Sequence, residues 1–401
     1  MSRVSPSVGL LILLTVLNGN AIMAATVYLP SLPSIGRALD IPAEVMPLTL
    51  TIYLMAFGFG QLLFGPLSDR LGRRRVLLAG LVAMVMGSVA CAMAGSLTGL
   101  LAARLLQGLG AAAGMASGRA VLNDVYVGPA AARASSIVSA SLALAPILAP
   151  LLGGLIEEGL GWRANFAFSG LITVVVLAAL FFRLPETHRP GPPQASLARQ
   201  MLHSYGLLLH SRAFLSLIIV SSCIYAGLHG FNSGAPAVMI ETLGVSPVLY
   251  GLLAASASAG FFAGAMIASL FGLRLGVLHV ISLGGLFLAL GGIGLAVWVE
   301  MVGASVESIV ISRMIWAIGM GLAMPTSMTA AIGLNRSMLG AGAALAGFTQ
   351  TMGGALGAAA IAMFPAGNPH VLALVCGGTV VLGVLCWIGN YRAIRRAVTG
   401  E

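Results

Sequence analysis

Residues 65–75 read GPLSDRLGRRR, a short polar segment that lies between two long apolar runs. Gly72 permits a tight turn there. Asp69 stands at the end of the preceding run, where it can pair with an arginine or with the N-terminus of a neighbouring helix. Arginine clusters of this kind favour the cytoplasmic side of a bilayer. The segment therefore predicts a cytoplasmic loop between two membrane-spanning helices.

The composition of the whole chain supports a membrane protein. Of the 401 residues, 59% are hydrophobic and only 8% are charged, whereas soluble domains carry roughly 25% charged residues. This excludes a soluble enzyme, a nucleic-acid-binding protein and a disordered chain. The 53 glycines suit helices that approach one another closely in a bilayer. The four cysteines lie in apolar runs without metal-ligand spacing, so no metal or cofactor site is predicted.

Apolar segments long enough to cross the hydrocarbon core recur along the chain. They predict helices, because a bilayer offers no water to unpaired backbone groups. The sequence predicts an all-α membrane protein with twelve transmembrane helices, at 8–30, 45–67, 76–95, 98–123, 134–156, 165–183, 213–235, 247–271, 277–298, 306–331, 340–363 and 370–390.

The arginines set the predicted orientation, since all 20 basic residues are arginine. With the N-terminus inside, fifteen of them lie in segments on the cytoplasmic side and only Arg37 and Arg163 lie on the opposite side. Cytoplasmic segments of membrane proteins carry the excess of basic residues. Both termini are therefore predicted to be cytoplasmic, in a multi-pass protein of the bacterial inner membrane.

A polar segment at 188–212 divides the predicted spans six and six. It contains the prolines at positions 190, 192 and 193, which cannot continue a helix. Residues 197–209 are expected to form either a short interfacial helix or a solvated loop. The predicted organisation is thus an N-terminal six-helix bundle at 1–187, a cytoplasmic linker at 188–212 and a C-terminal six-helix bundle at 213–401.

The two halves share short motifs at matching places. Arg104 opens one span and Arg313 opens its counterpart 209 residues later, and each is followed by a glycine six positions on. Likewise Arg-Leu-Gly at 70–72 follows the second span and Arg-Leu-Gly at 274–276 follows the eighth. Parallel six-helix repeats of this kind are typical of one large transporter architecture.

The complete pattern G-x-x-x-D-R-x-G-R-R at 65–74 resembles the loop signature of the major facilitator superfamily. Further segments resemble its bicyclomycin/chloramphenicol (Bcr/CflA) group of drug:proton antiporters, namely 28–33 (YLPSLP), 60–66 (GQLLFGP), 104–108 (RLLQG), 149–154 (APLLGG), 161–163 (GWR) and 184–187 (LPET). The resemblance implies the major facilitator fold of two pseudo-symmetric bundles. It also implies proton-driven export of small amphipathic compounds.

The resemblance also implies roles for named residues. The loop residues that would take part in conformational switching are Gly65, Asp69, Arg70, Gly72, Arg73 and Arg74. The antiporter motif would comprise Pro146, Pro150, Gly153 and Gly154, although Ala149 stands where the family usually has glycine. Arg104 would be the arginine linked to proton coupling. A purely structural arginine bonded to backbone carbonyls is the alternative, because a charge at membrane depth is costly.

The first span departs from the family pattern. Relatives commonly carry an acid two residues before Tyr28, but this chain has Thr26 there and no carboxylate between Val8 and Leu29. A proton antiporter needs a group that takes up and releases a proton. The remaining candidates are Asp124 and His229, with Glu241 after them. Asp124 is expected to pair with Arg73 or Arg119 as a structural clamp, and His229 is alternatively a hydrogen-bonded packing residue.

A substrate cavity is expected between the halves near the middle of the membrane. Its candidate lining residues are polar or aromatic, and most could equally form hydrogen bonds between helices. They are Asn18, Asn20, Tyr28, Tyr53, Gln61, Gln107, Asn232, Trp316 and Gln350.

The sequence therefore predicts an inner-membrane transporter, not an enzyme, that exports small amphipathic drugs or metabolites by alternating access, coupled to protons. Its expected partners are the small-molecule substrate, protons and the lipid bilayer, and it is expected to be a monomer. An exporter dedicated to one metabolite, such as a siderophore, with weak or no proton coupling is the alternative. A membrane sensor that transports nothing is a third hypothesis.

Overall fold

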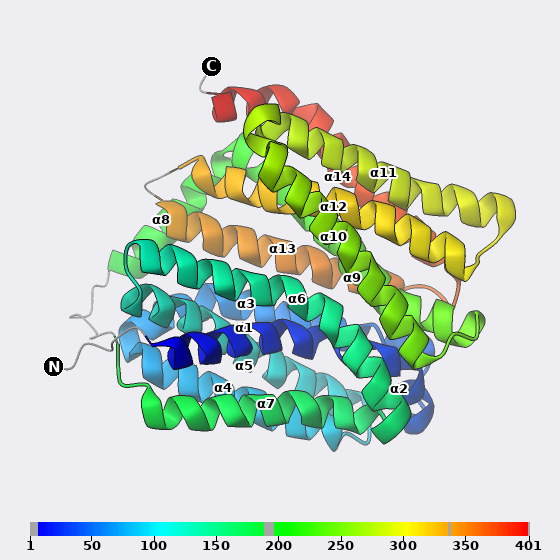
Figure 1. Cartoon of the computed structure of the whole chain (residues 1–401), viewed down its shortest axis with the longest axis horizontal. Coiled ribbons are helices and arrows are strands. Elements are labelled where there is room, and N and C mark those ends of the chain that lie inside the picture. Colours follow the sequence, from blue (N-terminus) through cyan, green and yellow to red (C-terminus); the bar gives the residue numbers. More distant parts are fainter. Residues whose placement is uncertain (1–6, 188–195, 336–337, 400–401) are drawn as a thin grey trace. The chain divides into compact units, whose positions relative to one another are not determined.

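The computed structural model describes residues 7–187, 196–335 and 338–399, which are mainly helices joined by short turns (Figure 1). The α-helices before residue 188 are α1 (Val8–Thr26), α2 (Leu32–Leu39), α3 (Leu48–Leu71), α4 (Arg73–Ala92), α5 (Leu97–Val125), α6 (Pro129–Leu160) and α7 (Trp162–Arg183). Those that follow are α8 (Ser196–His210), α9 (Arg212–Pro236), α10 (Pro247–Leu275), α11 (Val277–Val302), α12 (Val306–Gly333), α13 (Leu339–Ile361) and α14 (Pro369–Thr399).

Ten helices in the described ranges are long and apolar enough to cross a membrane. They coincide with ten of the predicted spans, so the expectation of an all-α, multi-pass membrane protein is confirmed. The other two predicted spans, 134–156 and 340–363, lie in α6 and α13, which are helical but not among the ten. The number twelve stays a prediction, as does the cytoplasmic position of both termini.

The helix boundaries differ from the prediction near the end of the first span. This span is predicted over 8–30, but α1 ends at Thr26, and a 3₁₀ turn at Leu29–Ser31 leads into the short helix α2. Pro30 and Pro33 explain the break, because proline has no N–H for a helix interior yet is well suited to a first turn.

The predicted linker contains a helix, α8. It covers residues 197–209, for which the sequence allowed either a short helix or a loop. It packs against α9 and α13. The prolines at 190–193 lie outside the described residues. The linker boundaries at 188 and 212 remain a proposal.

Serine residues begin several of the long helices. In each of these, the backbone N–H three positions along donates to the serine hydroxyl, which satisfies an amide group that has no partner in the first turn. The capping serines are Ser7 (α1), Ser96 (α5), Ser211 (α9), Ser246 (α10) and Ser305 (α12).

The repeated Arg-Leu-Gly segments form equivalent turns. Gly72 joins α3 to α4 with φ of 99°, and Gly276 joins α10 to α11 with φ of 76°. Positive φ values are costly for residues with a Cβ atom but not for glycine. The same glycine therefore makes the same connection in both halves of the chain.

The chain forms two compact units, one of residues 1–42 and 52–195 and the other of residues 43–51 and 196–401. In the first unit, a core of buried leucine and valine side chains holds α1, α4, α5 and α7 together. The pairs α4–α5 and α4–α7 lie side by side (Figure 1).

Close glycine contacts repeat in the two units. In the first, a Cβ atom on Gly87 of α4 would lie 2.5 Å from the backbone nitrogen of Gln107 on α5. In the second, a Cβ atom on Gly291 of α11 would lie 2.5 Å from the backbone nitrogen of Trp316 on α12. Small residues let membrane helices approach this closely, so the predicted sequence repeat is also a repeat of helix packing.

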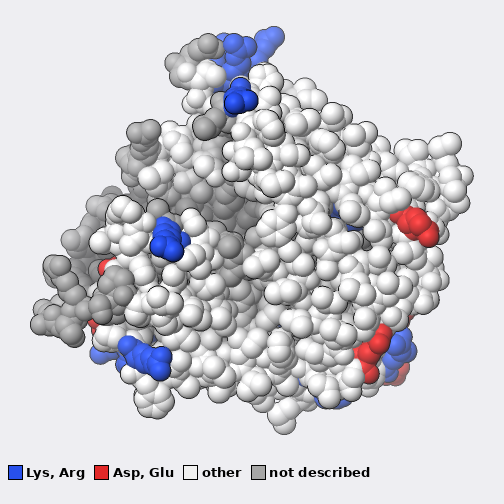
Figure 2. All heavy atoms as spheres, viewed as in Figure 1, with Lys and Arg blue, Asp and Glu red and all other residues white. Residues whose placement is uncertain are grey.

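The described surface is poor in charge. On the face seen in Figure 2 most side chains are uncharged. Many large apolar side chains of the described residues are exposed, among them Leu171 and Leu286. A soluble protein would hide such side chains, whereas lipid tails solvate them.

Candidate functional site

Arg104 of α5 is the centre of a buried polar site in the first unit. Its side chain is 0% exposed. Its Nη1 donates to the carbonyl oxygen of Ala24 in α1 at 2.9 Å and to Oε1 of Gln107 at 2.5 Å. A buried guanidinium needs such acceptors to offset its loss of hydration.

Aromatic rings enclose the same guanidinium. Its central carbon lies 4.4 Å from the ring centre of Tyr28, 4.2 Å from that of Tyr53 and 6.0 Å from that of Phe166. The Tyr53 hydroxyl donates to the carbonyl oxygen of Ala21 at 2.6 Å, which fixes its ring. Cation–π attraction of this kind is worth about 2 kcal/mol or more when the cation is desolvated.

The polar site continues from α5 into α4. The amide of Gln107 donates to the Ser88 hydroxyl at 2.9 Å, and that hydroxyl donates to the carbonyl of Met84 at 2.8 Å. Arg104, Gln107 and Ser88 thus form a connected chain of buried hydrogen bonds. Such a chain orients each member through its neighbour.

Thr26 lies near this site in α1. It is buried, and its hydroxyl donates to the carbonyl of Ile22 one turn back at 3.4 Å. The α1 helix thus offers Arg104 the carbonyl oxygen of Ala24, and position 26, where the family resemblance leads us to expect an acid, supplies no carboxylate.

A second cluster surrounds Arg73 at the start of α4. Its guanidinium forms an ion pair with Asp69, contacts Asp124 at the end of α5 with Nε to Oδ2 at 3.2 Å, and donates to the Ser68 hydroxyl at 2.8 Å. The hydroxyl of Thr187 also donates to Asp124, at 3.2 Å. Of the two predicted partners of Asp124, Arg73 is the one confirmed. We call these five residues the Arg73 clamp.

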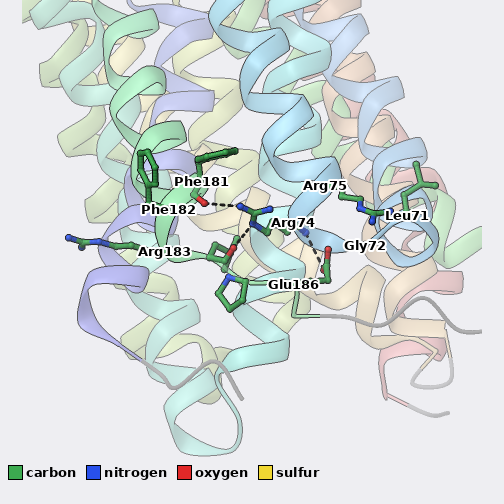
Figure 3. Close-up of a pocket in the computed structure, with 10 residues that line it drawn as sticks. Leu71, Gly72, Arg74, Arg75, Phe181, Phe182, Arg183 and Glu186 are labelled. Carbon is green, nitrogen blue, oxygen red and sulfur yellow. Dashed lines mark hydrogen bonds between the residues drawn. The ribbon is translucent and has the colours of Figure 1, made fainter. Parts of the chain in front are cut away.

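Arg74 joins the loop to the end of α7. Its Nε donates to the carbonyl of Leu184 at 2.6 Å and its Nη2 donates to the carbonyl of Phe181 at 2.7 Å (Figure 3). Its backbone N–H donates to Glu186 at 3.3 Å. These partners of Arg74 were not among the predicted site residues, although the acid at position 186, just after the sixth predicted span, was a usable signal for one of them.

The other loop residues contribute less. Gly72 lies against the Glu186 carboxylate, so a Cβ atom there would collide with it. Gly65 has open space around it, and Arg70 is exposed.

The proline and glycine pairs of the predicted antiporter motif lie in one continuous helix, α6. Pro146 is exposed and Pro150 is buried. Gly153 packs directly on the carbonyl of Val27, and Gly154 is buried. Asn165 of α7 donates to the carbonyl of Gly153 at 3.2 Å, so this part of α6 is tied to both α1 and α7.

The predicted cavity residues fall into two groups, one in each unit. In the first, Asn18 bonds within its own helix, and Asn20 donates to Thr173 of α7 at 2.9 Å. Tyr28, Tyr53 and Gln107 belong to the Arg104 site, and Gln61 is partly buried.

The second unit holds the other three, Asn232, Trp316 and Gln350. Gln350 of α13 donates to Ser221 at 2.9 Å, and Asn232 is partly buried. Trp316 is buried beneath Arg313, whose guanidinium carbon lies 4.4 Å from the indole and 4.7 Å from the ring of Phe231. Arg313 is thus packed against aromatic rings as Arg104 is. The 209-residue offset between the two arginines could have indicated this equivalence from the sequence.

His229 is buried in the second unit. Its ring meets that of Tyr225 edge-on, with centres 4.5 Å apart. Among the described residues neither ring nitrogen has a hydrogen-bond partner. The alternative role predicted for His229 is that of a hydrogen-bonded packing residue. The ring is indeed packed, but it forms no hydrogen bond among the described residues.

A family model described as Major Facilitator Superfamily matches residues 14–238. The chain belongs to the major facilitator superfamily. It is 33% identical to a chloramphenicol resistance protein of Pseudomonas aeruginosa over 91% of this chain and 87% of that protein. It is 28% identical to multidrug resistance protein D of Escherichia coli (strain K12) over 95% of each chain.

Solved structures of transporters share the fold. A peptide transporter, POT, determined in complex with alafosfalin, matches with a TM-score of 0.77 and 16% identity over 96% of this chain and 95% of that one. A bacterial homologue of the human lysosomal transporter Spinster matches with a TM-score of 0.73 and 17% identity over 96% of each. As a member of the superfamily, this chain is a multi-pass inner-membrane transporter and not an enzyme. Membership also argues against the membrane-sensor hypothesis.

Proposed function

We propose that this major facilitator exports small amphipathic drugs or metabolites across the inner membrane by alternating access of two six-helix bundles, at 1–187 and 213–401. The observation that carries the proposal is the 33% identity to a chloramphenicol resistance protein over 91% of the chain. The polar and aromatic cavity residues of both units are our candidates for contacts with the substrate.

The Arg73 clamp would control switching between conformations. It joins the start of α4, the end of α5 and the segment after α7 through charged and polar side chains. The Asp69 and Asp124 side chains are 48% and 25% exposed, so water can reach both. Exposed ion pairs contribute only about 0–1 kcal/mol each. Contacts of this strength can form and break during a transport cycle.

Proton coupling is proposed to act through this clamp. A protonated Asp124 would lose its charge attraction to Arg73, which would loosen the end of α5 from the start of α4 while the rest of the helix pair stays packed. A deprotonated Asp124 would restore the contact. Asp124 is therefore our first candidate for the proton-binding group, with buried His229 as the second.

Arg104 is proposed to hold α1 against α5 during the cycle. Its acceptors are a backbone carbonyl of α1 and a side chain one turn away on α5. Movement of α1 relative to α5 would change the hydrogen bond to Ala24 first. Arg104 would therefore transmit a movement of α1 to the buried chain through Gln107 and Ser88.

A dedicated metabolite exporter with weak or no proton coupling is the second candidate. It is favoured by α1, which has no carboxylate and in which the Thr26 hydroxyl bonds within its own helix. Under this alternative, substrate export would follow the substrate gradient and ignore the pH gradient.

Drug susceptibility tests the export proposal directly. The full chain is expressed in a bacterial host that lacks its own efflux pumps, and the host is challenged with a panel of amphipathic antibiotics that includes chloramphenicol. The proposal expects a raised inhibitory concentration for at least one compound and a return to the baseline in Arg104→Ala. A panel without any protected compound would favour the dedicated metabolite exporter.

A further inference from the structure

A polar pocket of about 620 Å³ lies where the start of α4 meets the end of α7. Its size falls within the roughly 300–1,000 Å³ that is typical of small-molecule sites. It is lined by Arg74 and Arg75 from α4, by Phe181 and Arg183 from α7, and by Glu186 after it (Figure 3). We call it the headgroup pocket.

The headgroup pocket carries a positive excess. Arg74 is engaged by the carbonyls of Phe181 and Leu184. The side chains of Arg75 and Arg183 are exposed and form no hydrogen bond or ion pair with another residue in the described ranges. In Figure 3 they lie on opposite sides of Arg74. Two uncommitted arginines therefore flank a pocket whose carboxylate, Glu186, already accepts from the Arg74 backbone.

An apolar groove of about 390 Å³ begins at the same place. It follows the seam between the two helices, with Leu78, Ala79 and Val82 on α4 and Val174, Leu177 and Ala178 on α7. Phe181 lines both the groove and the headgroup pocket. The pocket and the groove are thus neighbours along one helix pair.

The length of the groove matches part of an acyl chain. Val174 and Phe181 are seven residues apart on α7, which corresponds to about 10 Å of helix. One leaflet of the hydrocarbon core is about 15 Å deep. A groove that starts beside the arginines would therefore run through most of one leaflet.

We propose that the headgroup pocket and the groove together bind one anionic phospholipid. Its phosphate would lie in the headgroup pocket beside Arg74, with Arg75 on one side and Arg183 on the other attracting it electrostatically, and one acyl chain would lie along the α4–α7 seam. Basic pockets between helices at the cytoplasmic side of a membrane bind anionic headgroups. The groove selects a lipid over a soluble anion, because only a lipid has a chain to fill it.

Lipid binding to the purified full chain tests this proposal. The chain in detergent is titrated with palmitoyl-oleoyl phosphatidylglycerol or with the phosphatidylcholine of the same acyl chains, and bound lipids are counted by native mass spectrometry. One phosphatidylglycerol is expected to bind more tightly than the rest, and phosphatidylcholine is expected to show no such site. Equal binding of the two lipids would overturn the proposal.

Two variants locate the headgroup. Each arginine near an anionic lipid changes binding about fivefold, so Arg75→Gln with Arg183→Gln should weaken the tight site roughly 25-fold. The matched control is Arg274→Gln with Arg392→Gln, which removes two exposed arginines of the second unit. An equal loss in the control would mean that net charge, and not this pocket, holds the lipid.

A third variant tests the groove, and inorganic phosphate tests the source of the anion. Ala178→Trp fills the groove and should weaken the tight site, whereas Val175→Trp, at an exposed position outside the groove, should not. Millimolar inorganic phosphate should leave the lipid bound. If phosphate displaces it, or if both tryptophan variants bind like the native chain, the site does not hold a phospholipid.

Discussion

The contact between Gly87 and α5 leads to a quantitative prediction, because the distances from an added Cβ atom on Gly87 to the atoms of α5 are known. A Cβ atom on Gly87 would lie 2.5 Å from the nitrogen and 2.7 Å from the Cα atom of Gln107. Ordinary contact begins near 3.4 Å, so Gly87→Ala must move the helices apart by about 0.9 Å. Backbone atoms cannot rotate away as a side chain can.

The expected cost has two parts. Overpacking of this kind costs about 1–3 kcal/mol, and alanine returns about 1 kcal/mol through its higher helix propensity. The net loss of stability is thus about 0–2 kcal/mol, or up to about 8 °C in Tm for a domain of this size. The shift also stretches the hydrogen bond from the Gln107 amide on α5 to the Ser88 hydroxyl on α4, which is 2.9 Å long. A 0.9 Å displacement would lengthen this bond beyond hydrogen-bond range, and Gln107 would be oriented less firmly toward Arg104.

Two control variants separate stability from mechanism. Gly285 is a helical glycine at which an added Cβ atom would meet no neighbouring heavy atom within 4 Å. Gly285→Ala should therefore leave Tm unchanged or slightly raised. Gly291→Ala has the same 2.5 Å contact in the second unit but lies far along the sequence from Arg104. Tm is followed in detergent and substrate efflux in cells. We expect Gly87→Ala to lose more efflux than Gly291→Ala at a similar Tm.

Equal Tm and equal efflux in Gly87→Ala and Gly285→Ala would refute the predicted overpacking at Gly87. The close contact would then have no energetic consequence. Equal efflux losses in Gly87→Ala and Gly291→Ala would instead remove Gln107 from the explanation.

Three further predictions concern charged residues. Arg104→Ala should abolish efflux at normal expression, and Arg104→Lys should keep part of it, since lysine lacks the planar guanidinium; full efflux by the alanine variant would exclude Arg104 from the mechanism. Asp69→Asn removes one ion pair of the Arg73 clamp and should slow transport while substrate affinity, measured by equilibrium binding, stays near normal; a large affinity loss at unchanged turnover would contradict this. In proteoliposomes, an imposed pH gradient should drive substrate uptake by the native chain but not by Asp124→Asn, while counterflow exchange persists in both; if the native chain ignores the gradient, the uncoupled exporter is favoured.

The spans were predictable because a bilayer leaves little choice. An apolar run of sufficient length must be helical there, and ten of the expected spans were found. The break after Thr26 was harder to place, since the apolar run continues through Leu29 and only Pro30 and Pro33 mark the change.

The contacts of the candidate site were only partly predictable. The pairing of Asp124 with Arg73 follows from opposite charges at the ends of neighbouring spans. In contrast, Arg104 and Arg74 are held largely by backbone carbonyls, those of Ala24, Phe181 and Leu184. Every residue has a carbonyl, so no residue type in the sequence identifies such an acceptor. It becomes visible only when the helices are packed.

The repeated glycine contacts also show where this chain tolerates added length. From Gly87 to the capping serine of α5 is nine residues, but from Gly291 to that of α12 is fourteen. The second unit thus accommodates five more residues while both glycines keep a 2.5 Å spacing. The extra length lies at the end of α11, where Met301 and Val302 are 77% and 78% exposed. The bond between Gly303 and Ala304, ahead of the capping Ser305, is accordingly a suitable place for an epitope or fluorescent tag that reports on topology without disturbing either helix pair.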